Sequence, residues 1–83
     1  MTMRKETIKF VTDLLLSIYQ GSEFNATTTM YYLGLDMIDI QEIHDKLWAK
    51  YRRYAPGGFP DDFENGLWDM SANNIINYID DLI

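Results

Sequence analysis

The side chains that most often carry out protein chemistry are scarce in this chain. It has 83 residues, no cysteine and a single histidine, His44. Without cysteine there is no thiol nucleophile, thiolate metal site or disulfide. One histidine is too few to build a histidine zinc site or a catalytic triad within one copy of the chain. No pair of groups is spaced as nucleophile and base, so we expect neither enzymatic activity nor a metal site.

One short segment nevertheless has the form of a loop that presents a side chain at the start of a helix. It reads LGLDMID and spans residues 33–39. Asp36 is a suitable N-cap, and Asp39, three residues later, favours the positive end of a helix. This places Met37 at the first helical position, where a reactive group would be displayed. A methionine thioether has no hydroxyl with which to act as a nucleophile.

Three segments show the periodicity of amphipathic helices. In the first, the apolar stripe is Ile8, Val11, Leu14, Leu15 and Ile18, with Gly21 as a plausible stop. In the second, which begins after Asp36, it is Ile40, Ile43, Leu47, Tyr51 and Tyr54. In the third, Ser71 is a candidate N-cap, and the stripe is Ile75, Ile76, Ile79 and Leu82 or Ile83.

The segments between these helices lack a clear period. Residues 22–35 predict a long ordered loop, whose apolar anchors would be Phe24, Met30, Tyr31, Tyr32 and Leu33. Ala55-Pro56-Gly57-Gly58 ends the second helix, and Phe59-Pro60-Asp61-Asp62 begins a short helical turn that is interrupted near Gly66. Trp68 and Tyr78 are expected in the core. The fold class is therefore all-α: one domain, residues 1–83, as a small bundle of three main helices and one short helix.

The formal net charge of -6 argues against nucleic acid as a partner, because phosphates would repel the chain. From Asp61 to the end there are acids and no bases. The bases form two groups, Arg4, Lys5 and Lys9, and then Lys46, Lys50, Arg52 and Arg53. No segment is long and apolar enough to predict a membrane span, and we expect a cytoplasmic protein.

The order of these elements resembles acyl and peptidyl carrier proteins. In that family an amphipathic helix and a long loop lead to the motif L-G-x-D-S-[LI]-D, which opens the second helix. An apolar-Pro-acidic-acidic turn and a final helix of the type V-x-x-[AI]-x-x-[YI]-[IL] follow. This chain has LGLDMID at 33–39, FPDD at 59–62 and NIINYI at 74–79. The resemblance covers essentially the whole chain and implies a four-helix carrier-protein bundle.

The main departure from the family is at the attachment site. The resemblance implies that the serine after the aspartate would carry phosphopantetheine, but Met37 stands at that position. Attachment cannot occur there, so we expect no phosphopantetheine cofactor. The nearest upstream hydroxyls are those of Thr27, Thr28 and Thr29 in the loop. Met37 is either an apolar residue that faces a partner or a neutral replacement at a site that has lost its function.

The second departure concerns the docking helix, which in the family carries a run of acids that pair with basic enzyme surfaces. Here Glu42 and Asp45 remain, whereas Trp48, Ala49 and Lys50 stand where glutamates are common. Tyr31 and Tyr32 precede the motif where an acid is frequent, and residues 52–58 form an insertion. We therefore expect poor binding to the usual synthase enzymes. The candidate protein-binding residues are Asp36, Met37, Ile38, Gln41, Glu42, His44, Asp45 and Trp48.

Several of these residues also have purely structural interpretations. Ile38 is typical of a core or groove position, and His44 of a solvated helix residue. Trp48 is either an exposed binding residue or packs against the segment Tyr54–Pro56. The bases from Lys46 to Arg53 either stabilise the C-terminal end of the helix dipole or contact a phosphate or an acidic protein.

The leading hypothesis is a carrier-like protein that cannot be phosphopantetheinylated at the usual position and that binds a protein partner non-covalently through the second helix. It would be auxiliary to lipid, polyketide or peptide biosynthesis. One alternative is an acyl carrier that uses another attachment residue or binds acyl groups non-covalently. Another is a small acidic inhibitor or immunity-type protein on a carrier scaffold.

Overall fold

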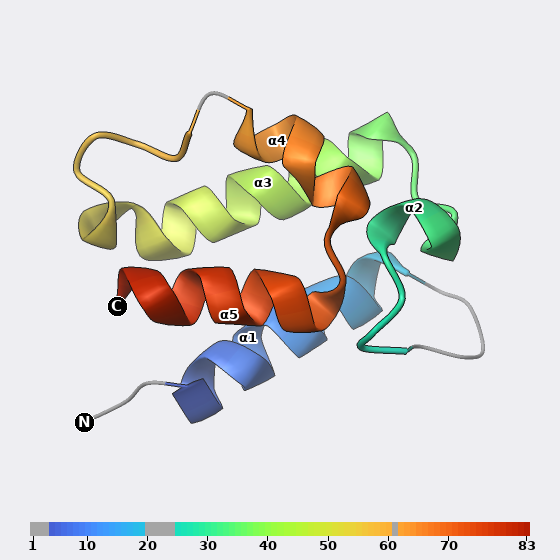
Figure 1. The fold of residues 1–83 in the computed structure, drawn as a ribbon, viewed down its shortest axis with the longest axis horizontal. Coiled ribbons are helices and arrows are strands. Elements are labelled where there is room, and N and C mark those ends of the chain that lie inside the picture. The colour runs from blue at the N-terminus through green and yellow to red at the C-terminus, as the bar shows by residue number, and fades with distance from the viewer. Residues whose placement is uncertain (1–3, 20–24, 61) are drawn as a thin grey trace.

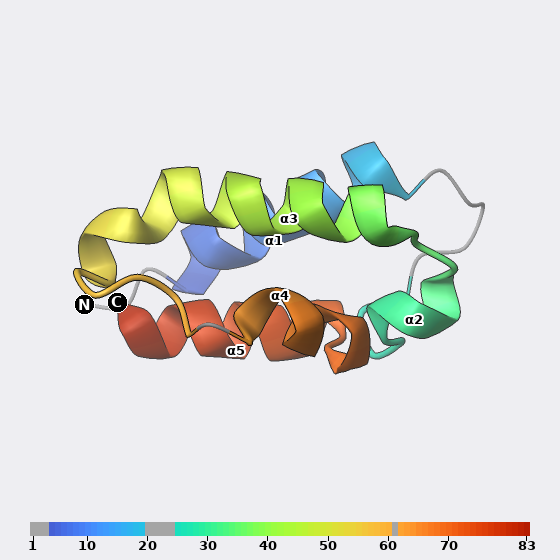
Figure 2. The same ribbon diagram turned by 90° about the horizontal axis from the view of Figure 1, so that it is seen from above.

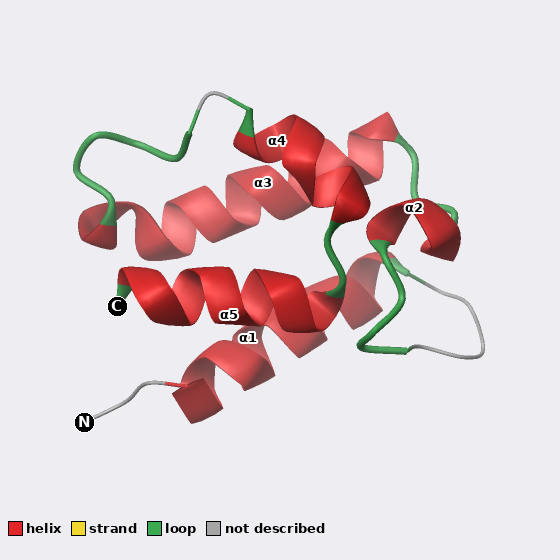
Figure 3. Cartoon of the chain, viewed as in Figure 1, coloured by secondary structure: helices red, strands yellow, loops and turns green. Residues whose placement is uncertain are grey.

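The computed structural model describes residues 4–19, 25–60 and 62–83. Helices hold 74% of these residues, and the described part of the chain contains no β-strand (Figure 3). The long helices are α1 (Arg4–Ile18), α3 (Met37–Tyr51) and α5 (Ala72–Leu82). The prediction of an all-α fold with three main helices is confirmed. Gly21, Phe24 and Asp61, which the sequence analysis assigned to a stop, an anchor and a turn, lie outside the described residues.

Four short elements connect the long helices. They are α2 (Met30–Leu33), the 3₁₀ turn η1 (Arg52–Tyr54), α4 (Phe63–Gly66) and the 3₁₀ turn η2 (Leu67–Asp69). The short helix expected after Phe59-Pro60 is α4, which ends at Gly66 as predicted. The expectation of an uninterrupted loop over residues 22–35 was wrong, because the described residues include the one-turn helix α2. Thr29 caps this turn by accepting a hydrogen bond from the Tyr32 amide.

The three long helices form the body of the molecule. α3 and α5 run in the same direction, and α1 runs against both and packs mainly on α5 (Figures 1 and 2). α4 crosses beside α3, and α2 lies at the end of the bundle where α3 begins (Figure 1). Most residues of the predicted stripes face inward, and the fully buried side chains include Val11, Leu15, Met30, Ile40, Ile43, Leu47, Leu67, Ile75 and Ile79. The expectation for Ile8 was wrong: it is 41% exposed, because Thr7 takes the buried position in this turn of α1.

The start of α5 is tied to the segment before α2. Ser71 caps α5 as predicted: its hydroxyl accepts a hydrogen bond from the Asn74 amide at 3.2 Å, and its own amide donates to Asn74 Oδ1 at 3.0 Å. Thr29 and Ser71 also form an isolated antiparallel β-bridge. Beside it the Met30 amide donates to the Met70 carbonyl at 3.0 Å. Residues far apart in sequence are thus fixed to each other by backbone hydrogen bonds.

Ser71→Ala should lower the free energy of unfolding by about 1 kcal/mol, because it removes the acceptor for the first turn of α5. Urea unfolding followed by far-UV circular dichroism measures the change. Asn73→Ala is the matched control, since this side chain is exposed in the first turn of the same helix and does not cap it. A Ser71→Ala midpoint equal to that of Asn73→Ala would show that the cap does not stabilise the fold.

Candidate functional site

The predicted N-terminus of the second helix is confirmed and is closed by two reciprocal hydrogen bonds. Asp36 Oδ1 accepts from the Asp39 amide at 2.9 Å, and Asp39 Oδ2 accepts from the Asp36 amide at 3.2 Å. Immediately upstream, Gly34 ends α2 with φ of 83°, a left-handed conformation that suits glycine. Leu35 is buried between them. These contacts fix the direction in which the first turn of α3 leaves the loop.

The first two side chains of α3 project into solvent. Met37 is 66% exposed and Ile38 is 72% exposed. The expectation that Ile38 lines a core or groove was wrong, because Ile40 and Ile43 occupy the inward face. Side chains two residues apart on a helix point in directions that differ by about 200°. Ile38, two residues before the buried Ile40, therefore points away from the core.

Tyr31 and Tyr32 are exposed as well, by 66% and 80%, and their rings meet edge-to-face with centroids 5.6 Å apart. The expectation that they anchor the loop was wrong. Met30, which is fully buried, is the anchor of this turn, so the two residues after it face outward. We refer to Tyr31, Tyr32, Met37 and Ile38 together as the apolar patch. These residues belong to α2 and to the first turn of α3, two elements that lie at the same end of the bundle (Figure 1).

The remaining candidate binding residues continue along the outer side of α3. Gln41, Glu42 and Asp45 are exposed, while His44 and Trp48 are half-buried. Residues three and four apart are neighbours on a helix surface, so positions 37, 41, 44, 45 and 48 form one row and positions 38, 42 and 45 the next. Seven of the eight predicted residues therefore share a single strip along α3, and the eighth, Asp36, is the N-cap directly before it.

The far end of this strip is an aromatic cluster that the sequence analysis did not foresee. His44 contacts the rings of Phe59 and Phe63, with centroids 5.8 and 6.0 Å away, so the expectation of a solvated histidine was wrong. Phe59 in turn contacts Phe63 and Tyr78. Trp48 packs edge-to-face on Phe59, with ring centroids 5.3 Å apart, and Gly58 lies beside its ring. Trp48 therefore has a structural contact, as one of the two interpretations proposed. The contacts found are with residues 58–59, whereas the expected segment was Tyr54–Pro56.

A pocket of about 210 Å³ opens at this cluster and is lined by His44, Trp48, Gly58 and Phe59. Gly58 lies beside the indole in the turn that follows η1, and its amide donates to the Ala55 carbonyl at 2.8 Å. Gly58 has φ of 86°, and a Cβ at this position would lie 3.8 Å from the Trp48 ring. We refer to these four residues as the aromatic corner.

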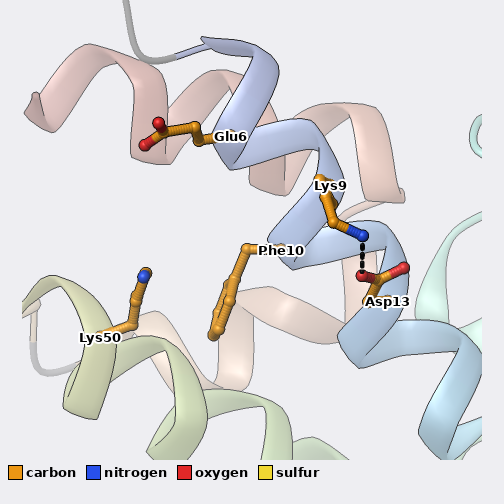
Figure 4. Close-up of a pocket in the computed structure, with 5 residues that line it drawn as sticks. All are labelled: Glu6, Lys9, Phe10, Asp13 and Lys50. Atoms are coloured by element: carbon orange, nitrogen blue, oxygen red, sulfur yellow. Dashed lines mark hydrogen bonds and ion pairs between the residues drawn. The ribbon is translucent and has the colours of Figure 1, made fainter.

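A second depression, of about 280 Å³, lies between α1 and the end of α3 (Figure 4). Its lining is mostly charged: Lys9 pairs with Asp13 at 3.0 Å, and the Lys50 ammonium lies 5.4 Å from the centre of the Phe10 ring. Positive and negative groups alternate there, with Glu6 at the edge. The charges of this groove are balanced, and both lysines already have local partners. The groove therefore has fewer unpaired groups available to bind a ligand than the strip on α3.

Two tyrosines border the core near these sites: Tyr51 is buried and Tyr78 is half-buried. Burial raises the pKa of the Tyr51 phenol above 10, although a hydrogen bond with the buried Thr7 hydroxyl opposes this rise. Burial also raises the pKa of Tyr78, whose ring lies 4.8 Å from that of Phe63. The expectation that Tyr78 and Trp68 contribute to the core holds in part, since both are half-buried and pack against it.

Within the described residues no group of three histidine or acidic side chains is arranged to hold a metal ion. None of the helices formed by these residues combines the length and the apolar character that crossing a membrane requires. The strip on α3 presents apolar, aromatic and acidic side chains to solvent. In the sequence, the available signal for the aromatic corner was Phe59, an aromatic residue directly after the Pro56-Gly57-Gly58 break.

The sequence matches no protein-family model, and neither a curated protein nor a solved structure gives a match.

The stability of the protein should fall as the pH rises above 10. The folded state holds protons on Tyr51 and Tyr78 that the unfolded chain releases near pH 10, so unfolding is accompanied by proton release there. Below pH 9 this contribution is complete, and above it the contribution is progressively lost. Urea midpoints measured from pH 8 to 11 give the dependence.

Tyr51→Phe should flatten this dependence, whereas Phe10→Leu serves as the control. The Phe10 ring meets Tyr51 edge-to-face at 5.6 Å, so its truncation perturbs the same contact without removing a titrating group. Phe10→Leu should lower the midpoint equally at every pH. Equal slopes for Tyr51→Phe and the unaltered protein would contradict the assignment to Tyr51.

Proposed function

We propose that this chain is a carrier-protein-like helical bundle that binds a protein partner non-covalently through α3 and the apolar patch. The observation that supports it most directly is the exposed pair Met37 and Ile38 at the start of a helix closed by the Asp36–Asp39 capping box. Covering exposed apolar side chains such as Met37 and Ile38 removes apolar surface from water, and this makes a favourable contribution to the free energy of binding. The carrier resemblance adds that residue 37 is the position at which such a scaffold would display its working group.

Covalent carriage is disfavoured by the chemistry of the presenting loop. Met37 offers no hydroxyl to a phosphopantetheinyl transferase. Upstream, the Thr27 hydroxyl is bonded to Asn25 Oδ1 at 2.6 Å, and the Thr29 hydroxyl accepts from the Tyr32 amide as the cap of α2. Two of the three nearby threonine hydroxyls thus take part in the turns that shape this end of the molecule.

Non-covalent storage of an acyl chain is also disfavoured. The interior between the long helices is filled by aliphatic side chains such as Leu15, Ile43 and Ile79, each exposed by 1% or less. The two depressions described above are lined by charged or aromatic residues at the surface, and neither includes these core residues. A bundle packed in this way has its free apolar surface outside, on the apolar patch.

The charge of the strip limits the charge that the contact surface of a partner can carry. Between Phe10 and Asp45 the sequence contains no lysine or arginine, and Asp36, Glu42 and Asp45 are exposed on α3. An acidic partner surface would be repelled. We therefore propose a partner with an apolar contact region and a neutral or basic rim, in a pathway of lipid, polyketide or peptide synthesis.

The first test is the intact mass of the protein after incubation with coenzyme A and a broad-specificity phosphopantetheinyl transferase. The unaltered protein should show no change in mass, and Met37→Ser should gain one phosphopantetheine, because the presenting loop would then carry the missing hydroxyl. Met37→Ala is the matched control and should stay unmodified. Modification of the unaltered protein would overturn non-covalent action, and an unmodified Met37→Ser would argue against the carrier resemblance.

The second test is partner binding. Protein partners cross-linked to and captured with the unaltered chain from its host should be bound at least about tenfold more weakly by Met37→Glu, since the change buries an unpaired charge. Affinities for each purified partner can be measured by isothermal titration calorimetry.

Leu16→Glu is the control, because Leu16 is an exposed apolar residue on α1, outside the strip, with 48% exposure. It should bind with unchanged affinity. If Met37→Glu and Trp48→Ala both leave every captured partner bound as before, the assignment of this surface is wrong.

A further inference from the structure

The aromatic corner has the arrangement of rings that favours a cation. The planes of Trp48 and Phe59 meet at 78°, and those of His44 and Phe59 at 81°. Two walls at nearly right angles, with Gly58 beside the indole, leave an open corner of about 210 Å³. Aromatic faces carry negative electrostatic potential, and the faces of tryptophan bind cations most strongly.

The charged groups nearest the corner mostly agree with this. Asp45 Oδ1 lies 3.3 Å from His44 Nδ1 and is a surface neighbour of Trp48, three residues on. Asp62 directly precedes Phe63, whose ring faces His44. Arg52 opposes it, because its amide bonds to the Trp48 carbonyl and places the guanidinium-bearing side chain one turn beyond the indole.

The size of the corner limits what can enter it. Sites for whole small molecules are commonly about 300–1,000 Å³, so a corner of about 210 Å³ is suited to one side chain. Among cationic side chains, arginine is the one whose flat guanidinium stacks on aromatic rings, whereas the lysine ammonium is compact and strongly hydrated.

We infer that the aromatic corner receives an arginine side chain of the protein partner. That the arginine belongs to a protein rests on the proposed function. The guanidinium stacks on the Trp48 face, its hydrocarbon stem lies against Phe59, and Asp45 supplies the opposite charge. The apolar patch and this corner then form the two ends of one contact strip along α3.

The test uses a small probe, so that it does not depend on any partner. N-acetyl-arginine methylamide is titrated into the protein while the Trp48 indole N–H is followed by two-dimensional NMR. N-acetyl-citrulline methylamide is the matched neutral probe, since its urea group has nearly the shape of guanidinium without the charge. We expect a saturable shift with arginine and about tenfold weaker binding of citrulline.

Four variants locate the site. Trp48→Ala should abolish the shifts of the His44 and Phe59 amides. Asp45→Asn should weaken arginine binding severalfold, and Arg52→Gln should strengthen it because a competing cation is removed. Leu16→Ala, on α1 and outside the strip, is the control and should bind as the unaltered protein does. Circular dichroism of each variant verifies the fold, and Asp45→Asn and Arg52→Gln alter exposed side chains only.

Equal binding of arginine and citrulline would overturn the inference, as would arginine shifts that survive in Trp48→Ala. Such a result would leave the proposed function standing if Met37→Glu still weakens a captured partner. Conversely, arginine binding at Trp48 in a protein whose partners ignore Met37→Glu would support the corner and contradict the assignment of the apolar patch.

Discussion

The backbone connection between residues 29–30 and 70–71 is the constraint on which the rest of the structure depends. The Met30 amide donates to the Met70 carbonyl, Thr29 is bridged to Ser71, and the Met30 side chain is fully buried. A turn as short as α2 has no stability of its own. Held in this way, it fixes Gly34 and Leu35, and these fix where α3 begins. The direction of the contact strip is therefore set by a link to α5, not by α3 alone.

The two sides of α3 serve different purposes, and the sequence separates them cleanly. Ile40, Ile43 and Leu47 face the core and hold the helix in place, while the opposite side carries the strip. Phe59 extends the strip at its far end, because it contacts His44 and Trp48 on α3 and Tyr78 on α5. The segment after η1 therefore packs back onto α3 and alters the surface of that helix.

Much of the fold could be predicted because it follows from local rules. The apolar stripes of α1, α3 and α5, the cap at Asp36 and the cap at Ser71 are all decided by residues within a few positions of one another. The helix α2 escaped prediction because it is held by a backbone hydrogen bond from Met30 to Met70, forty residues later in the sequence. Tyr31, Tyr32 and Ile38 were misplaced for a related reason: aromatic and branched side chains suggest burial, but only the packing of Met30 and Ile40 shows which positions are already filled. The aromatic corner could not be predicted, because it depends on the backbone path of residues 55–59, and this segment has no helical or strand periodicity from which that path could be inferred.

The side chain at position 37 contributes neither to the helix cap nor to the core, so the fold does not explain why this residue is a methionine. The capping box uses the side chains of Asp36 and Asp39, and the core uses Ile40, so the fold requires nothing of the residue between them beyond a helical backbone. Serine or methionine would satisfy that requirement nearly equally, since their helix propensities differ by only a few tenths of a kcal/mol. Stability therefore does not select methionine. An exposed thioether with three rotatable bonds adapts its shape to an apolar surface. Together with exposed Ile38 and the two tyrosines, it gives this end of α3 an apolar and solvent-exposed surface that the fold itself does not require.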